Sequence, residues 1–259
     1  MSIALRLAGI RISRGKRPIV DAVDAQIEEP GLVAICGPNG AGKSTLLAAL
    51  AGVLPFEGSV VLDNGQPKAS DLAYMPQATA VNAGLTVLET VLLGRIERLR
   101  WHITADDLDA AIAALQSLHL SHLAEARLDR LSGGQQQLVF IAQRLVRKPR
   151  LLLLDEPTSA LDLNRQMILL EELLAYVATK KAIAVLAMHD LTLAARYAST
   201  VLLMRDGRLV AAGRPRDVFT PGTIFEAYGV DAELLTTSAG HSAIVPLAPA
   251  RRPPHGKSG

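Results

Sequence analysis

The spacing of hydrophobic and polar positions predicts a chain that builds its sheets from two kinds of strand. Residues 3–12 alternate apolar side chains with other residues over much of their length, which is typical of an antiparallel strand with one buried face. The runs at 32–35, 151–154 and 183–186 are wholly apolar, as strands buried on both faces of a parallel sheet are. Helical stretches separate these runs. The pattern therefore predicts an α/β fold.

Turn and helix signals divide the chain further. Asn-Gly at 64–65 and Asp-Gly at 206–207 predict hairpins, because both dipeptides favour tight turns between antiparallel strands. A short strand is expected over 72–77. Three helices are predicted in the middle of the chain, beginning at Thr86, Thr104 and Ser132.

This arrangement predicts one domain with an insertion. The sheet-forming parts, about residues 1–77 and 149–230, flank a helical insert of about 78–148, and we expect the domain to cover 1–237. The remaining residues, 238–259, are rich in Pro, Ala and Arg. We expect them to form a mostly disordered tail, because such a composition buries little apolar surface.

Size and composition fit a single domain of this kind. The 259 residues are 49% hydrophobic, which is enough for a sizeable core, and the net charge of +2 gives no reason to expect nucleic acid as a partner. The single cysteine, Cys36, excludes an internal disulfide and fits a reducing compartment. No apolar run approaches a membrane span, and the N-terminus lacks the apolar core of a signal peptide. We therefore expect a soluble, cytosolic protein.

The stretch from Gly37 to Ser44 has the pattern G-x-x-x-x-G-K-S of a P-loop. It lies between the apolar strand at 32–35 and a helical run, and this context predicts a phosphate site. Glycines let backbone N–H groups converge on an anion, and the helix start adds positive charge. We expect Lys43 to reach the β- and γ-phosphates of a nucleotide and Ser44 to bind Mg²⁺. The candidate phosphate-binding residues are Gly37, Pro38, Asn39, Gly40, Ala41, Gly42, Lys43, Ser44 and Thr45.

Two carboxylates follow the leucine run at 151–154. Asp155 and Glu156 stand at the C-terminal end of a predicted buried strand, where open α/β sheets place ligand-binding groups. Neighbouring residues on a strand point to opposite sides, so the two can have different roles. We expect Asp155 to hold the hydration shell of Mg²⁺ near Ser44. Glu156 is expected to polarise the water that attacks the γ-phosphate.

The sequence Leu-Ser-Gly-Gly-Gln at 131–135 predicts a second anion-binding surface. With Ser132 as N-cap, the two glycines leave bare N–H groups at a helix start. One γ-phosphate does not need two such surfaces from one subunit, so we expect this helix start to close over a nucleotide held by a second copy. Alone, the motif would be read as a capped helix with a flexible first turn. The candidate residues are Ser132, Gly133, Gly134 and Gln135.

Together these motifs resemble the nucleotide-binding subunit of an ATP-binding cassette (ABC) transporter. The P-loop, Gln77, Leu-Ser-Gly-Gly-Gln, Leu-Leu-Leu-Leu-Asp-Glu and His189 occur in the order of that family, and the resemblance covers about residues 1–230. It implies a P-loop NTPase fold of the RecA-like type: a parallel-sheet core, an antiparallel β subdomain and an inserted α-helical subdomain. It also implies ATP hydrolysis, with ATP and Mg²⁺ as cofactors.

The resemblance also implies roles for particular residues. Gln77 resembles the glutamine that touches Mg²⁺ and the attacking water and relays movement to the membrane partner. His189 resembles the histidine that contacts the γ-phosphate, and Asp162 resembles the aspartate of a loop that crosses to the opposing subunit. The implied catalytic residues are therefore Glu156, His189 and Gln77. The implied metal ligands are Ser44, Gln77 and Asp155.

One position departs from the family pattern. Where many cassettes carry an aromatic residue that stacks on adenine, this chain aligns Arg14. A guanidinium plane can also stack on a ring, so Arg14 is a candidate adenine contact. It is equally well interpreted as a surface arginine.

The resemblance further implies a role in transport. Residues 83–95 and 217–230 are similar to the same regions in importers of iron–siderophore complexes, haem and cobalamin. This predicts the ATP-hydrolysing subunit of such an importer, with a zinc or manganese importer as the alternative. A non-transport cassette protein fits less well, because the chain has one P-loop and a compact helical insert. A metabolic P-loop kinase would give Leu-Ser-Gly-Gly-Gln no role.

Partners and location follow from the same resemblance. We expect a second copy of the chain in an ATP-sandwich homodimer, integral membrane permease subunits and, indirectly, a periplasmic or lipid-anchored substrate-binding protein; no nucleic acid is expected. The chain would be a peripheral subunit at the cytoplasmic face of the inner membrane. The permease is expected to contact the helical insert just after Gln77.

Overall fold

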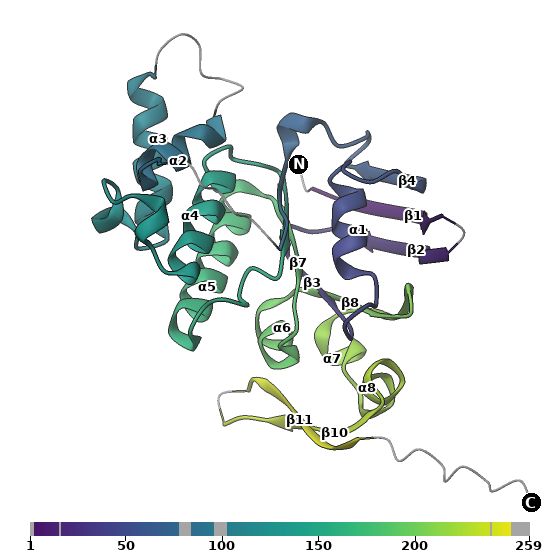
Figure 1. The fold of residues 1–259 in the computed structure, drawn as a ribbon. Helices are drawn as coiled ribbons and strands as arrows, with labels where there is room; N and C mark the ends of the chain where they lie inside the picture. The colour runs from purple at the N-terminus through teal and green to yellow at the C-terminus, as the bar shows by residue number, and fades with distance from the viewer. Residues whose placement is uncertain (1–2, 16, 78–83, 96–102, 239, 250–259) are drawn as a thin grey trace, which may run out of the picture.

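The computed structural model describes residues 3–15, 17–77, 84–95, 103–238 and 240–249. A central sheet divides the molecule into two sides, shown in Figure 1. Strands β1, β2 and β4 lie with helix α1 on one side, and the helical insert with α2, α3 and α4 lies on the other.

In the part of the chain that the structure describes, six strands form the central sheet in the order β5-β6-β7-β3-β8-β9. The first five run parallel, and β9 pairs antiparallel with β8. The wholly apolar runs of the sequence form β3, β6 and β7, whose residues are all buried. The bounds are Gly31–Cys36 (β3), Leu72–Met75 (β5), Leu151–Asp155 (β6), Ile183–Ala187 (β7), Thr200–Arg205 (β8) and Arg208–Gly213 (β9).

The leucine run in β6 shows why the central strands are apolar throughout. Leu151 and Leu153 pack into the hydrophobic cluster that contains α1, whereas Leu152 and Leu154 pack into the cluster that contains α4 and α5. Neighbouring residues on a strand point to opposite faces. A sheet covered on both faces therefore needs apolar residues at every position.

A three-stranded antiparallel sheet covers the α1 side. Its order is β2-β1-β4, with β1 at Leu5–Arg14, β2 at Arg17–Ile27 and β4 at Glu57–Leu62. The alternating apolar residues predicted at 3–12 face the core, since Ile3, Leu5, Leu7, Ile10 and Ile12 are all buried.

The predicted helix starts are confirmed. Thr86, Thr104 and Ser132 each accept a bond from the backbone N–H three residues later. The helices are Lys43–Leu50 (α1), Val87–Leu92 (α2), Ala105–Ser117 (α3), Gly133–Leu145 (α4), Leu163–Lys180 (α5), Leu191–Tyr197 (α6), Pro215–Val218 (α7) and Pro221–Tyr228 (α8). Short 3₁₀ turns lie at Ala69–Asp71, Leu93–Arg95, Ser121–Leu123 and Leu128–Arg130. Within the described ranges, no helix is long and apolar enough to cross a membrane.

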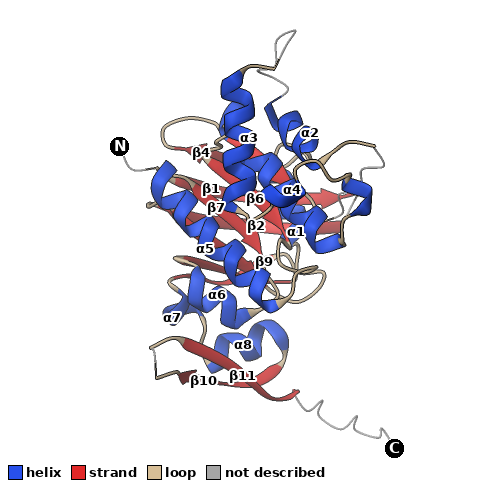
Figure 2. Ribbon diagram, turned by 90° about the vertical axis from the view of Figure 1, so that its left-hand side faces the viewer, coloured by secondary structure: helices blue, strands red, loops and turns tan. Residues whose placement is uncertain are grey.

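The C-terminal region corrects one expectation. β11 (Ser242–Pro249) pairs antiparallel with β10 (Val230–Thr236), so the expectation of disorder is wrong for residues 242–249. Ile244 packs against the core and donates its N–H to Thr192 Oγ1 at 3.2 Å. The segment carries enough apolar side chains to pack, and an edge strand tolerates its prolines. Figure 2 shows this hairpin and the helical insert at opposite ends of the molecule. Residues 250–259 lie outside the described residues.

Candidate nucleotide-binding site

The glycine-rich stretch joins the end of β3 to the start of α1. A Cβ at Gly37 would lie 2.2 Å from the Met204 carbonyl oxygen, so only glycine fits there. Gly42 immediately precedes α1 with φ of 100°, a conformation that favours glycine. No side chain caps the helix at this residue. The first N–H groups of α1 are therefore free of a capping side chain, as an anion site at a helix start requires.

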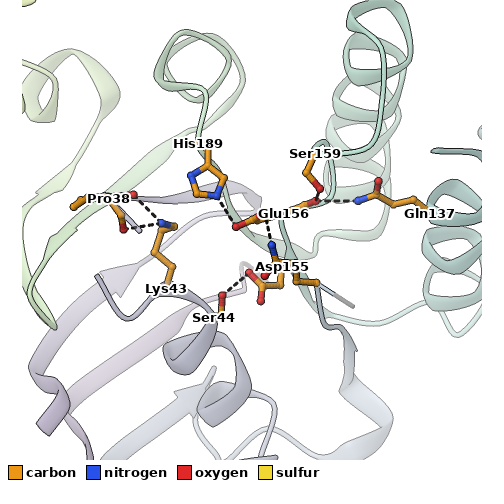
Figure 3. Close-up of polar contacts among 10 residues, drawn as sticks. Pro38, Lys43, Ser44, Gln137, Asp155, Glu156, Ser159 and His189 are labelled. Carbon is orange, nitrogen blue, oxygen red and sulfur yellow. Dashed lines mark hydrogen bonds and ion pairs between the residues drawn. The ribbon is translucent and has the colours of Figure 1, made fainter. Parts of the chain in front are cut away.

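Lys43 is the first residue of α1 and is 5% exposed. Its Nζ donates to the carbonyl oxygens of Gly37 at 2.7 Å and Pro38 at 3.1 Å, as Figure 3 shows. Burial lowers the pKa of the Lys43 amine, and the nearby charges of Glu156 and Asp155 oppose this shift. Neutral carbonyl oxygens are weaker acceptors than phosphate oxygens. The ammonium group is thus held where an arriving phosphate would displace the carbonyls.

Ser44 and Asp155 meet between α1 and the end of β6. Ser44 Oγ donates to Asp155 Oδ1 at 3.0 Å. Asp155 is 2% exposed, and burial raises the pKa of its carboxyl group while the bond from Ser44 opposes the shift. Burial therefore makes the ionised carboxylate less favourable here than in water, and a nearby cation would oppose that effect.

Glu156 lies between two polar side chains from the neighbouring strands. Gln77 Nε2 donates to Glu156 Oε2 at 2.8 Å, and His189 Nε2 lies 2.5 Å from Oε1. Gln77 follows β5 and His189 follows β7, the strands that flank β6 in the sheet. The structure thus brings the three expected catalytic residues together at the carboxyl edge of the sheet.

The three expected catalytic residues border a cavity of about 700 Å³. Residues 39–45 of the P-loop and α1 line it, together with Gln77, Glu156 and His189. Arg17 and Ile19 of β2 complete the lining. Its volume lies within the range of small-molecule sites.

Arg17, and not Arg14, borders this cavity. The two arginines are directly opposite each other where β1 and β2 meet, and both are exposed. Only Arg17 is among the residues that line the cavity. The position of Arg14 agrees with its interpretation as a surface arginine, and an adenine contact by Arg14 stays a prediction.

The Leu-Ser-Gly-Gly-Gln residues do not line the cavity of their own chain. Ser132 and Gln135 form a capping box at the start of α4, with Ser132 N donating to Gln135 Oε1 at 3.0 Å. A Cβ at Gly134 would lie 2.7 Å from the Ala160 carbonyl oxygen, so this helix start packs against the turn that follows Glu156. Asp162 caps α5 by accepting from Arg165 N at 2.9 Å and is likewise absent from the cavity lining.

Two further residues contact the main chain of Glu156. Gln137 Nε2 donates to the Glu156 carbonyl oxygen at 2.9 Å, and Ser159 Oγ donates to the same oxygen at 3.0 Å. Ser159 belongs to the loop, ending at Asp162, that resembles the family's crossing loop, whereas Gln137 was not singled out from the sequence. A glutamine two positions beyond the motif is an ordinary helix former, and only the folded structure shows its contact with Glu156.

Comparison with known proteins agrees with this geometry. Residues 20–159 match the family described as ABC transporter. The hemin import ATP-binding protein HmuV of Streptomyces coelicolor is 38% identical over 235 residues, covering 87% of this chain and 83% of that protein. The ferric enterobactin transport ATP-binding protein FepC of Escherichia coli is 35% identical over 257 residues, covering 94% of each.

Solved structures show the same fold. A metal-chelate type ABC transporter in an inward-facing conformation aligns with a TM-score of 0.84 at 27% identity, covering 95% of this chain and 98% of that chain. An ATP-binding cassette in its ADP conformation aligns with a TM-score of 0.77 at 25% identity, covering 88% and 99%. The chain therefore belongs to the ABC transporter family and is an ATP-binding domain of the transporter ATPases, which hydrolyse ATP. ATP-binding subunits of importers in this family work with separate membrane permease subunits.

Arg17→Ala is expected to weaken ATP binding about two- to fivefold, since an exposed guanidinium–ring contact contributes about 0.5–1 kcal/mol. Arg14→Ala is the matched control and should leave affinity unchanged, because Arg14 does not line the cavity. Titration with a fluorescent ATP analogue measures both. If only Arg14→Ala binds ATP more weakly, then Arg14, and not Arg17, is the residue that contacts the nucleotide.

Asp155→Asn is expected to stabilise the nucleotide-free protein. The raised pKa of Asp155 means that the folded chain disfavours the ionised carboxylate, so stability falls as pH rises from about 3.9 through the raised value. Asparagine stays neutral, so its gain in Tm should be largest at neutral pH and shrink as pH falls toward about 3.9. Thermal unfolding at several pH values measures this. A lower Tm at neutral pH would contradict the assignment.

Proposed function

We propose that this chain is the ATP-hydrolysing subunit of an importer that moves an iron chelate, either a siderophore complex or haem, across the cytoplasmic membrane. Two relatives that align with most of the chain are named for hemin import and ferric enterobactin transport. A solved metal-chelate transporter aligns with nearly all of it. These names support an iron chelate over the zinc or manganese alternative.

The observation that carries the hydrolytic role is the placement of Glu156. Its carboxylate faces the cavity between Gln77 and His189. In this position it accepts a proton from the water that attacks the γ-phosphorus, while the β–γ bridging oxygen leaves with ADP. Gln77 and His189 orient the carboxylate, and Lys43, which also lines the cavity, holds the phosphate oxygens.

Ser44 and Asp155 fit Mg²⁺ that arrives with ATP. Both offer oxygen atoms, the donors that Mg²⁺ prefers, and one carboxylate with phosphate oxygens is its usual set at such sites. The raised pKa of Asp155 also fits a carboxylate that a cation completes. Mg²⁺ supplies charge neutralisation to the phosphates. Gln77, which follows the neighbouring strand β5, completes the proposed ligand set.

A second copy completes the site in this proposal. Ser132 to Gln135 and Asp162 lie at helix starts that do not line their own cavity, which supports a role across a homodimer. Permease subunits, and a substrate-binding protein outside the membrane, are the further partners, with this subunit peripheral at the cytoplasmic face. Part of the expected permease contact, residues 78–83, lies outside the described residues.

Glu156→Gln is expected to lower ATP hydrolysis about 10²–10⁴-fold, the usual contribution of a general base, while ATP still binds. Glu29→Gln removes an exposed carboxylate and should hydrolyse ATP normally. Phosphate release measures the rate, and nucleotide titration measures binding. Hydrolysis by Glu156→Gln at the wild-type rate would show that the base lies elsewhere.

Lys43→Ala in the source cells is expected to abolish uptake of haem-bound or siderophore-bound radioactive iron, because the phosphates lose their main cation. Lys180→Ala, at an exposed lysine of α5, should leave uptake intact. Zinc and manganese uptake should also be unchanged in both strains. Loss of zinc or manganese uptake with normal iron-chelate uptake would overturn the proposed substrate.

A further inference from the structure

The main chain of Glu156 has an unusual conformation. Its φ is 51°, in the left-handed region that a residue with a Cβ rarely adopts. A conformation of this kind persists only where the surroundings hold it. The turn bends the chain immediately after β6 and directs the Glu156 side chain toward Gln77 and His189.

Gln137 contacts this turn at two points. Its Nε2 donates to the Glu156 carbonyl oxygen at 2.9 Å, and its Oε1 accepts from Ala160 N at 3.3 Å. One amide side chain thus joins the two ends of the turn. Figure 3 shows Gln137 reaching the Glu156 main chain from the side opposite His189.

Helix α4 holds Gln137 in place. The capping box at Ser132 fixes the helix start, and Leu138 and Ile141 anchor its buried face. Gly134 packs directly on Ala160, so α4 contacts the turn through both Gly134 and Gln137. Because α4 belongs to the helical insert and Glu156 to the sheet, Gln137 links the two parts of the domain.

We infer that Gln137 is a positioning residue for ATP hydrolysis: it holds the Glu156 main chain in the left-handed conformation that aims the carboxylate. It does not line the cavity, so it acts through Glu156 and not on the nucleotide. The inference rests on the proposed role of Glu156 in hydrolysis. Ser159, which bonds the same carbonyl oxygen from within the turn, moves with the turn and cannot anchor it.

Two substitutions test this role. Gln137→Ala removes both bonds, and Gln137→Glu keeps the shape of the side chain but cannot donate to the carbonyl oxygen. Both are expected to lower kcat about 10- to 100-fold, the scale of a small misplacement of a catalytic group, with ATP affinity changed less than about twofold. Thermal unfolding confirms that each variant is folded. Normal kcat in both folded variants would overturn the inference.

Gln143→Ala is the matched control. Gln143 lies on the same helix and donates its amide to the Thr90 carbonyl oxygen at 2.8 Å, far along α4 from Glu156. It should keep the wild-type kcat. A loss equal to that of Gln137→Ala would show that loosening α4 anywhere is enough, which also contradicts a specific role.

The double variant with Glu156→Gln separates positioning from general damage. If Gln137 acts through the Glu156 carboxylate, Gln137→Ala should cause almost no further loss in single-turnover hydrolysis once that carboxylate is gone. Equal fold-losses in both backgrounds would overturn the inference. Glu156→Gln at the wild-type rate would instead overturn the proposed function, so the two failures are distinguishable.

Discussion

The pairing register of the parallel strands is the constraint on which the site depends. Ala187 of β7 pairs with Asp155 of β6 on one side and with Ile35 of β3 on the other. β5 pairs with β6 in the same way, with Met75 opposite Leu154. The four strands therefore end at one edge, where Gln77, Glu156, His189 and the P-loop follow them. A slip of one residue would turn every side chain of a strand to the other face, and the cavity would lose its lining.

The site combines groups whose charged forms or main-chain conformations are unfavourable by themselves. Burial lowers the pKa of Lys43 and raises the pKa of Asp155, so each charged form is disfavoured where it stands. The main chain of Glu156 is also unfavourable, because its φ lies in the left-handed region. Ionisable groups with shifted pKa values are common at functional sites, because a bound ligand supplies the opposite charges that stabilise their charged forms. The packed clusters on both faces of the sheet provide the stability that lets the chain carry them.

Much of this was predictable from the sequence because the signals are local. Apolar runs predicted the central strands, and hydroxyl caps predicted the starts of α2, α3 and α4. The spacing of the P-loop and the Asp155–Glu156 pair predicted the phosphate site. Each of these signals depends on neighbours within a few residues of the chain.

The contacts that the sequence did not predict are those between distant segments. Arg17 lines the cavity beside the P-loop and Arg14 does not, although the two residues pair across β1 and β2. Gln137 meets Glu156 because α4 packs against β5, the strand next to β6. The strand at 242–249 forms because β10 and the core offer it a surface. In each case a residue contacts a segment outside its local sequence: Arg17 borders the cavity with the P-loop, Gln137 bonds Glu156 and Ile244 bonds Thr192. Local periodicity does not indicate such contacts.

In the proposed dimer, the nucleotide is held by the cavity of one chain and covered by the start of α4 from the other. A crystal structure of the Glu156→Gln variant with ATP and Mg²⁺ tests it most directly. We predict a dimer in which the γ-phosphate lies between Lys43 of one protomer and the Ser132–Gln135 helix start of its partner. Bound ATP with that helix start open to solvent, in a protein that stays monomeric in solution, would contradict the account.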